Sequence, residues 1–200
     1  MTTAAVILAA GASRRLGRPK QLEPWGDSNL LSNVVARTRE FPVGEVWVVL
    51  GHDSETILAE TDFGDAGIIE NPEWGEGIAS SIRIALDALT RLSRCDRALI
   101  VMGDQPSVPV EVVEELMASH EKAEHPVSLP KYRYSWGNPV LVDRSLWPRL
   151  MSLEGDGGAQ RLWQAHPEWV NEVWFSDLAP RDVDTETDVV ELRPKHPGSG

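Results

Sequence analysis

The sequence predicts an α/β fold of three layers, in which helices cover both faces of a mostly parallel sheet. Short, almost wholly apolar runs such as residues 4–9 and 98–102 are typical of strands buried on both faces. Segments with apolar residues at helical spacing lie between them, most clearly residues 77–92. This alternation recurs along the first half of the chain, which favours right-handed βαβ units and a parallel sheet.

The first half of the chain alternates regularly. Strands are predicted at residues 4–9, 45–50, 67–70 and 98–102. Helices are predicted at residues 29–40, 53–60, 77–92 and 109–122. Pro109 suits the first position of the last helix, and Glu111 favours its first turn.

The second half is less regular. Strands are expected at residues 127–129, 139–142 and 172–175, helices at 144–152 and 158–165, and a short helix after Val183. Because neither a repeat nor a linker is visible, residues 1–193 are expected to form a single domain. Residues 194–200 are expected to be a disordered tail.

Composition narrows the class of protein. The net charge of -12 argues against a nucleic-acid partner. No run of 18 apolar residues occurs, which argues against a membrane span, and the chain starts as a strand instead of a signal peptide. A single cysteine, Cys95, fits a reducing cytoplasm, and the five histidines form no zinc signature.

The loop after the first strand, from Leu8 to Lys20, combines small residues with cations. Small side chains let backbone N–H groups approach an anion closely, and four Lys or Arg residues follow within seven positions. Arg15 and Lys20 could therefore neutralise phosphate groups. The alternative is an ordinary glycine turn with solvated arginines.

Two aspartates are candidate ligands for a divalent cation. Asp104 is the second residue after the fourth predicted strand, at the carboxyl edge of the sheet where ligands bind in open α/β folds. Mg²⁺ commonly takes one or two protein carboxylates and completes its shell with phosphate and water. A helix-capping role is the alternative for Asp104. Thr185 with Asp188 matches a helix start, which leaves Asp184 free to be a second carboxylate.

Three further features lie at loops. Residues 71–81 leave a strand, cross a Gly-rich loop and enter a helix with two serines, which suits either ligand contacts or ordinary capping. Residues 155–159 form a turn that could contact phosphate or acceptor, or be a plain loop. Tryptophans beside these motifs are candidates for stacking on a base or flat acceptor, and the others are expected in the core or an interface. The first group is Trp25, Trp74 and Trp136; the second is Trp147, Trp163, Trp169 and Trp174.

Residues 8–20 fit the pattern L-A-A-G-x-S-x-R-x-G-x-x-K at every specified position. The chain thereby resembles the molybdopterin-nucleotidyltransferase-like NTP transferases, and more narrowly the molybdenum cofactor cytidylyltransferases. Further matching segments are N-P-x-W-x-x-G-x-x-S-S at 71–81, G-D-Q-P at 103–106, G-D-x-G-A at 155–159 and D-V-D-T-x-x-D at 182–188. The resemblance implies a Rossmann-like fold of the glycosyltransferase-A type.

The resemblance also implies an activity. The terminal phosphate of molybdopterin would attack the α-phosphate of CTP in a Mg²⁺-dependent reaction that releases pyrophosphate. Lys20, Arg15 and Asp104 would be catalytic, and Asp104 with Asp184 would hold Mg²⁺. The nucleotide would contact Leu8, Ala9, Ala10, Gly11, Ser13, Lys20, Asn71, Ser80 and Ser81. A molybdoenzyme or its maturation chaperone is the class of protein partner that this resemblance implies.

The acceptor region departs from the family pattern. Gly137-Asn138-Pro139-Val140 stands where G-H-P-V is common, and Asn cannot titrate near neutrality as His does. Arg161 is displaced by one position after the 155–159 turn. Two alternatives therefore stay open: transfer to another phosphorylated acceptor, such as a sugar phosphate or phospho-carboxylate, and a non-catalytic nucleotide-binding cofactor chaperone.

Overall fold

A computed structural model describes residues 1–155 and 158–194. One sheet runs through it in the strand order β10-β7-β9-β6-β1-β4-β5, with β8 paired to β7. Its strands are β1 (Thr3–Leu8), β4 (Glu45–Leu50), β5 (Gly67–Glu70), β6 (Arg97–Met102), β7 (Val127–Tyr132), β8 (Ser135–Trp136), β9 (Val140–Asp143) and β10 (Val170–Phe175). Every strand predicted from the sequence is present, with ends that differ by a few residues.

The sheet is mostly parallel, as predicted. β1 pairs in parallel with β4 and β6, β4 with β5, and β10 with β7. β9 is the main exception, because it lies antiparallel to both β6 and β7. The carboxyl ends of β1, β4, β5 and β6 therefore meet at one edge, where a parallel sheet offers its ligand site.

The described helices agree with the prediction in the first half and are shorter than predicted in the second. They are α1 (Leu30–Thr38), α2 (Ser54–Glu60), α3 (Ile78–Leu92), α4 (Val110–Lys122), α5 (Trp147–Leu150), α6 (Gln160–Ala165) and α7 (Glu186–Leu192). The predicted helix 144–152 shrinks to α5 because residues 144–146 form a 3-10 turn before it.

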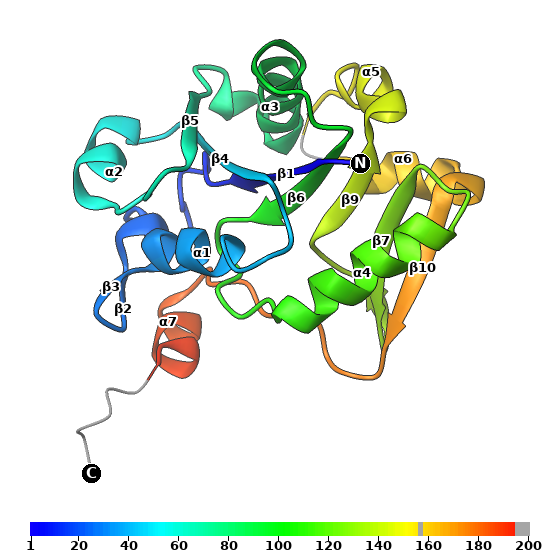
Figure 1. Cartoon of the computed structure of the whole chain (residues 1–200). Helices are drawn as coiled ribbons and strands as arrows, with labels where there is room; N and C mark the ends of the chain where they lie inside the picture. The colour runs from blue at the N-terminus through cyan, green and yellow to red at the C-terminus, as the bar shows by residue number, and fades with distance from the viewer. Residues whose placement is uncertain (156–157, 195–200) are drawn as a thin grey trace.

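Side chains that alternate along β1 build two separate cores. Val6 and Leu8 pack with residues of α3, α5 and α6, whereas Ala5 and Ile7 pack with residues of α1, α2 and α4. The sheet therefore lies between two helical layers (Figure 1), which confirms the predicted three-layer α/β/α sandwich.

A small antiparallel hairpin, β2 (Pro24–Trp25) with β3 (Ser28–Asn29), was not predicted. Trp25 is only 3% exposed and packs with Leu16, Leu30 and Val183 in a third cluster. The expectation that Trp25 stacks on a ligand is therefore wrong. Instead, this cluster joins the loop after β1 to the C-terminal segment that carries Asp184.

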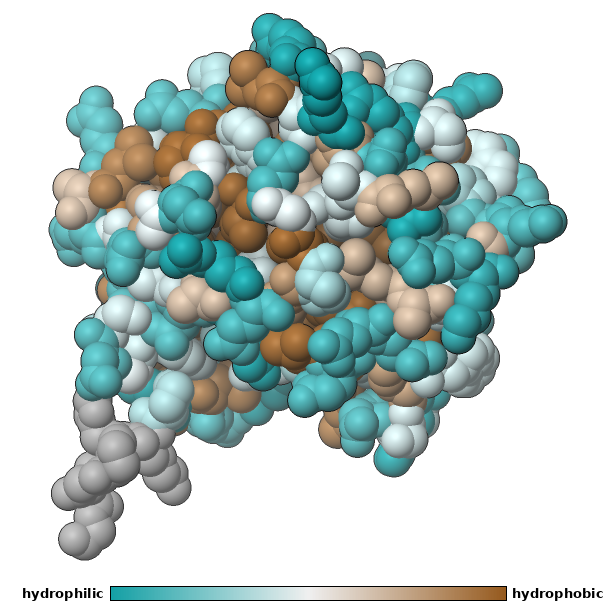
Figure 2. Space-filling model, viewed as in Figure 1, coloured by the Kyte–Doolittle hydropathy of each residue, from teal (hydrophilic) through white to brown (hydrophobic). Residues whose placement is uncertain are grey.

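The outer surface is mostly polar. Figure 2 shows hydrophilic side chains over most of one face, with smaller hydrophobic patches between them. Among the described residues, no helix is both long and apolar enough to cross a membrane. Residues 195–200 of the predicted tail, and Asp156 and Gly157 of the predicted turn, lie outside the described residues.

Candidate active site

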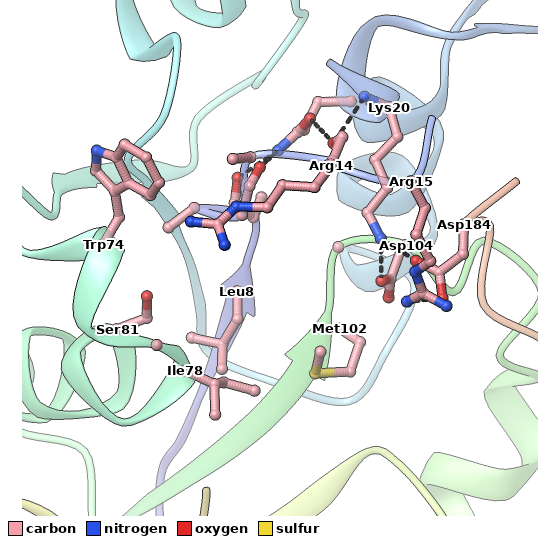
Figure 3. A pocket seen from close by; sticks show the side chains of 18 of the residues that line it. Leu8, Arg14, Arg15, Lys20, Trp74, Ile78, Ser81, Met102, Asp104 and Asp184 are labelled. Atoms are coloured by element: carbon pink, nitrogen blue, oxygen red, sulfur yellow. Dashed lines mark hydrogen bonds and ion pairs between the residues drawn. The ribbon is translucent and has the colours of Figure 1, made fainter. Parts of the chain in front are cut away.

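A pocket of about 450 Å³ opens at the carboxyl ends of β1 and β6. It brings together the loop after β1, the end of β6, the start of α3 and the segment before α7 (Figure 3). Its walls are Leu8, Ala9, Ala10, Gly11, Ala12, Ser13, Arg14, Arg15, Lys20, Gln21, Trp74, Gly75, Gly77, Ile78, Ser81, Met102, Gly103, Asp104 and Asp184. Most of the site residues predicted from the sequence therefore lie in one pocket.

The loop after β1 is held in shape by the buried side chain of Gln21. Its Nε2 donates to the carbonyl oxygens of Ala9 (2.8 Å) and Gly11 (3.1 Å), and its Oε1 accepts from Ser13 Oγ (3.3 Å). The Lys20 N–H donates to the same Ser13 hydroxyl (3.1 Å). Sequence reasoning assigned Gln21 no role, since only the folded loop shows what its amide contacts.

The same loop has features of an anion nest. The backbone N–H groups of residues 10–15 make no hydrogen bond to other parts of the described chain. Ser13 lies in the left-handed region, with φ of 49°, and a left-handed residue is a feature of backbone nests that bind anions. A Cβ at Gly11 would have no other atom within 4 Å. Glycine is therefore not required at this position by a close neighbour, and it leaves the space beside the loop open. The loop can therefore receive an anion.

Gly103 brings Asp104 close to this loop. Its N–H donates to the Leu8 carbonyl (3.0 Å), and a Cβ on it would lie 2.9 Å from both that oxygen and the Ala9 Cβ. Only glycine allows the ends of β1 and β6 to approach so closely. The Asp104 carbonyl in turn accepts from the Val183 N–H (2.9 Å), which ties the C-terminal segment to the same place.

Four charged side chains meet at one end of the pocket. Lys20 Nζ lies 2.6 Å from Asp104 Oδ2 and 2.8 Å from Asp184 Oδ1. Arg15 lies 2.6 Å from the other oxygen of Asp184. The side chains of Lys20, Asp104 and Asp184 are between 14% and 19% exposed, so these charges interact in a partly desolvated place.

Burial and charge act in opposite directions on this cluster. Burial raises the pKa of the Asp104 carboxyl above its usual value, although the Lys20 ammonium opposes that shift. Burial acts to lower the pKa of Lys20, but the carboxylates of Asp104 and Asp184 outweigh it and raise the pKa. Lys20 is therefore a firmly protonated cation between two carboxyl groups.

The carboxylates fit a divalent cation that arrives with phosphate. Asp104 Oδ1 is buried without a hydrogen-bond partner in the part of the chain that the structure describes. No cluster of three or more His, Cys, Asp or Glu occurs among the described residues. Two carboxylates with phosphate and water oxygens are a usual shell for Mg²⁺. The donor set thus suits a divalent cation shared with a bound nucleotide. The Lys20 ammonium lies between the two carboxylates, where such a cation would bind.

The opposite end of the pocket is less charged. Figure 3 shows Trp74, Ile78 and Ser81 across the pocket from Lys20, Asp104 and Asp184. Trp74 is held edge-on by His52, with ring centroids 4.8 Å apart. This end offers a flat ring and a hydroxyl.

Asn71 and Ser80 differ from their expected place, because neither lines the pocket. Both are 2% exposed, and Asn71 Nδ2 donates to the hydroxyls of Ser80 (2.9 Å) and Ser81 (3.0 Å). Asn71 Oδ1 accepts from the Glu73 N–H (3.0 Å). Asn71 therefore positions Ser81 and the loop that carries Trp74, and of the three polar residues only Ser81 lies at the surface of the pocket.

Asp184 is positioned by the start of α7. The Thr185 side chain accepts from the Asp188 N–H, and the Asp188 carboxylate accepts from the Thr185 N–H (2.9 Å), which forms a capping box. The predicted helix start is therefore confirmed. Since the same carboxylate also accepts from the Asp184 N–H (3.3 Å), the cap holds Asp184 beside Lys20.

Replacing Thr185 with alanine should lower the free energy of unfolding by about 1 kcal/mol, because a helix cap is lost. The measurement is urea unfolding followed by circular dichroism. Thr185→Ser keeps the hydroxyl and serves as the control. Equal stability of the alanine and serine variants would show that the cap contributes nothing.

An α/β sheet with an anion nest, a lysine and paired carboxylates at its carboxyl edge defines a nucleotidyltransferase. The model of the MobA-like NTP transferase domain matches residues 5–170, so the chain belongs to the MobA-like NTP transferase family. Two curated relatives carry different names. Nicotine blue oxidoreductase of Paenarthrobacter nicotinovorans is 31% identical over 199 residues, 94% of each protein. Molybdenum cofactor cytidylyltransferase of Escherichia coli is 22% identical over 139 residues, covering 70% of this chain and 69% of that protein.

Solved structures agree with this fold. The Mycobacterium sp. strain JC1 homologue of Mycobacterium tuberculosis Rv0371c is 31% identical, has a TM-score of 0.83, and matches over 95% of this chain and 94% of its own. The manganese complex of Rv0371c from M. tuberculosis H37Rv is 24% identical with a TM-score of 0.81, over 96% and 98% of the two chains. The second likeness shows the fold alone.

Proposed function

We propose that this protein transfers the nucleotidyl group of a nucleoside triphosphate, in the narrow form CMP from CTP, to the phosphate of a molybdopterin-type acceptor and releases pyrophosphate. One observation carries the proposal: Lys20, Asp104 and Asp184, which are distant in sequence, meet beside an open anion nest. Nucleotidyl transfer requires positioning and charge neutralisation more than a strong base, because the attacking phosphate is already ionised.

Each end of the pocket has a role in this proposal. The loop from Leu8 to Ser13, with Lys20, would hold the triphosphate through its N–H groups and the Lys20 ammonium. Arg15 would neutralise charge that develops on the leaving pyrophosphate. Asp104 and Asp184 would hold Mg²⁺, which when bound supplies positive charge to the phosphates. Trp74 and Ser81 would contact the nucleoside.

The choice of CTP and molybdopterin has separate support. The Ala9-Ala10-Gly11 form of the loop resembles the cytidylyl branch of the family. The relative from E. coli is named a molybdenum cofactor cytidylyltransferase. The manganese complex of Rv0371c supports use of a divalent cation by this fold.

The decisive experiment is pyrophosphate release with Mg²⁺, each of the four ribonucleoside triphosphates, and molybdopterin or a sugar phosphate as acceptor. We expect release with CTP and molybdopterin, and none after chelation of the metal. A clear preference for GTP, or product with a sugar phosphate alone, contradicts the narrow assignment. Nucleotide binding without turnover would instead support a non-catalytic carrier.

A second candidate is an oxidoreductase activity, because a relative matching 94% of the chain is named nicotine blue oxidoreductase. In that case the pocket would hold a redox nucleotide instead of a triphosphate. Oxidation of a reduced nicotinamide nucleotide in the presence of a redox dye, followed by its absorbance, and no pyrophosphate release would favour this candidate over the first.

A further inference from the structure

A second cavity, of about 240 Å³, lies beside the charged pocket. Its walls come from β1, α3, β6, β7, the β8–β9 segment and the start of α6. Among the described residues that line it, none carries a charge and only two have polar side chains. The two are Asn138 and Gln160. The full lining is Leu8, Ile78, Ile82, Ile100, Met102, Leu129, Trp136, Gly137, Asn138, Val140, Gly158, Ala159, Gln160 and Trp163.

The two hollows share a wall. Leu8, Ile78 and Met102 line both of them. Met102 stands two residues before Asp104 on the same strand end, so a molecule in the second cavity reaches the charged cluster past Met102. The second cavity therefore adjoins the charged pocket along the wall made by Leu8, Ile78 and Met102, where an acceptor could lie beside a bound nucleotide.

One wall of the cavity is a rigidly held indole. Trp136 Nε1 donates to the Glu172 carboxylate, and Lys131 Nζ lies 5.4 Å from the centre of the ring. The next residue, Gly137, packs so tightly on Tyr132 that a Cβ there would lie 2.6 Å from the phenol ring. Neither Glu172 nor Lys131 lines the cavity. The Trp136 ring is therefore fixed before any ligand binds, which lowers the entropic cost of stacking on it.

The lining selects against sugars and against anions. A sugar would bury several hydroxyls with only the side chains of Asn138 and Gln160 to pair with, and burying a hydroxyl without a hydrogen bond is unfavourable. A phosphate here would have no cation among the described lining residues, whereas Lys20 and Arg15 supply cations in the first pocket. Apolar walls and tryptophan faces instead favour a flat aromatic ring.

We infer that the second cavity binds an uncharged, flat, two-ring aromatic part of the substrate that lies beside the nucleotide, with Trp136 as its stacking wall and Asn138 as a hydrogen-bonding partner. The size agrees, since an apolar cavity of about 150 Å³ takes one benzene ring. Only an anionic tail of such a molecule would reach Lys20. The description of this molecule as the acceptor rests on the proposed function; binding of the ring does not.

The test is calorimetric titration of the whole protein with quinazolinone, a neutral two-ring heteroaromatic compound, and with glucose 1-phosphate. We expect quinazolinone to bind in the millimolar range or better and glucose 1-phosphate not to compete with it. Trp136→Ala should raise the Kd for quinazolinone at least about tenfold, and Trp136→Phe should restore most of the affinity. Trp174→Ala is the matched control, because Trp174 also lies near Lys131 (5.7 Å) but is 68% exposed and outside the cavity.

Thermal unfolding of each variant checks the fold, and binding of CTP with Mg²⁺ reports the charged pocket separately. Equal quinazolinone affinity of Trp136→Ala and Trp174→Ala overturns the inference, as does the absence of binding to the folded wild type. If quinazolinone binds through Trp136 but no pyrophosphate is released with any triphosphate, the proposed transfer reaction is contradicted, whereas the inferred aromatic binding site is supported.

Discussion

Replacing Asp104 with asparagine should lower the rate of nucleotidyl transfer by about two to three orders of magnitude. Asparagine keeps the shape of the side chain but removes the carboxylate that would hold the cation. The variant should therefore also need more Mg²⁺ for half-maximal rate. Its stability should change little, because Asp184 still pairs with Lys20 and the buried charge at position 104 is gone.

The measurement for Asp104→Asn is initial pyrophosphate release across a series of Mg²⁺ concentrations at saturating nucleotide. Asp182→Asn is the matched control, because Asp182 accepts from Gln105 Nε2 (2.6 Å) close by but does not line the pocket. A rate and Mg²⁺ requirement for Asp104→Asn equal to those of Asp182→Asn would remove Asp104 from the proposed metal site.

Replacing Lys20 with methionine should have two effects of opposite sign. Turnover should fall by orders of magnitude, because the triphosphate loses a cation. Binding of Mn²⁺ without nucleotide should become tighter, because Lys20 Nζ occupies the space between Asp104 and Asp184 in the free protein. Asp184 keeps its ion pair with Arg15, but the partly buried Asp104 carboxylate loses its cation. This loss should lower the free energy of unfolding by about 3 kcal/mol when no metal is present.

Free Mn²⁺ can be counted by electron paramagnetic resonance, and thermal unfolding with and without Mn²⁺ measures the stability. The expected result is a higher Mn²⁺ affinity for Lys20→Met than for the wild type, with a larger rise in Tm on adding the metal. Lys131→Met is the control, because it removes a partly buried lysine that pairs with Glu172 outside the site. It should change neither the Mn²⁺ affinity nor the rise in Tm on adding the metal. Unchanged or weaker Mn²⁺ binding by Lys20→Met would mean that the lysine does not stand in for the cation.

Much of the site was predictable because it depends on local sequence. A buried strand followed by small residues and cations predicted the anion-binding loop from Leu8 to Lys20. The capping pattern at Thr185 explained the helix start without Asp184, which was therefore a candidate metal ligand. The common edge of parallel strands placed Asp104 beside them. Gln21 escaped notice because its amide contacts backbone atoms that lie near it only after the loop has folded.

The sequence by itself determined the elements and the layered class, because strand and helix periodicities are properties of short segments. Only the tertiary structure decided that β9 runs antiparallel, that Trp25 is buried, and that Asn71 lies behind Ser81. The same holds for the uncharged cavity against Trp136. These features arise from packing between segments that are distant along the chain, and no local pattern specifies which of their surfaces meet.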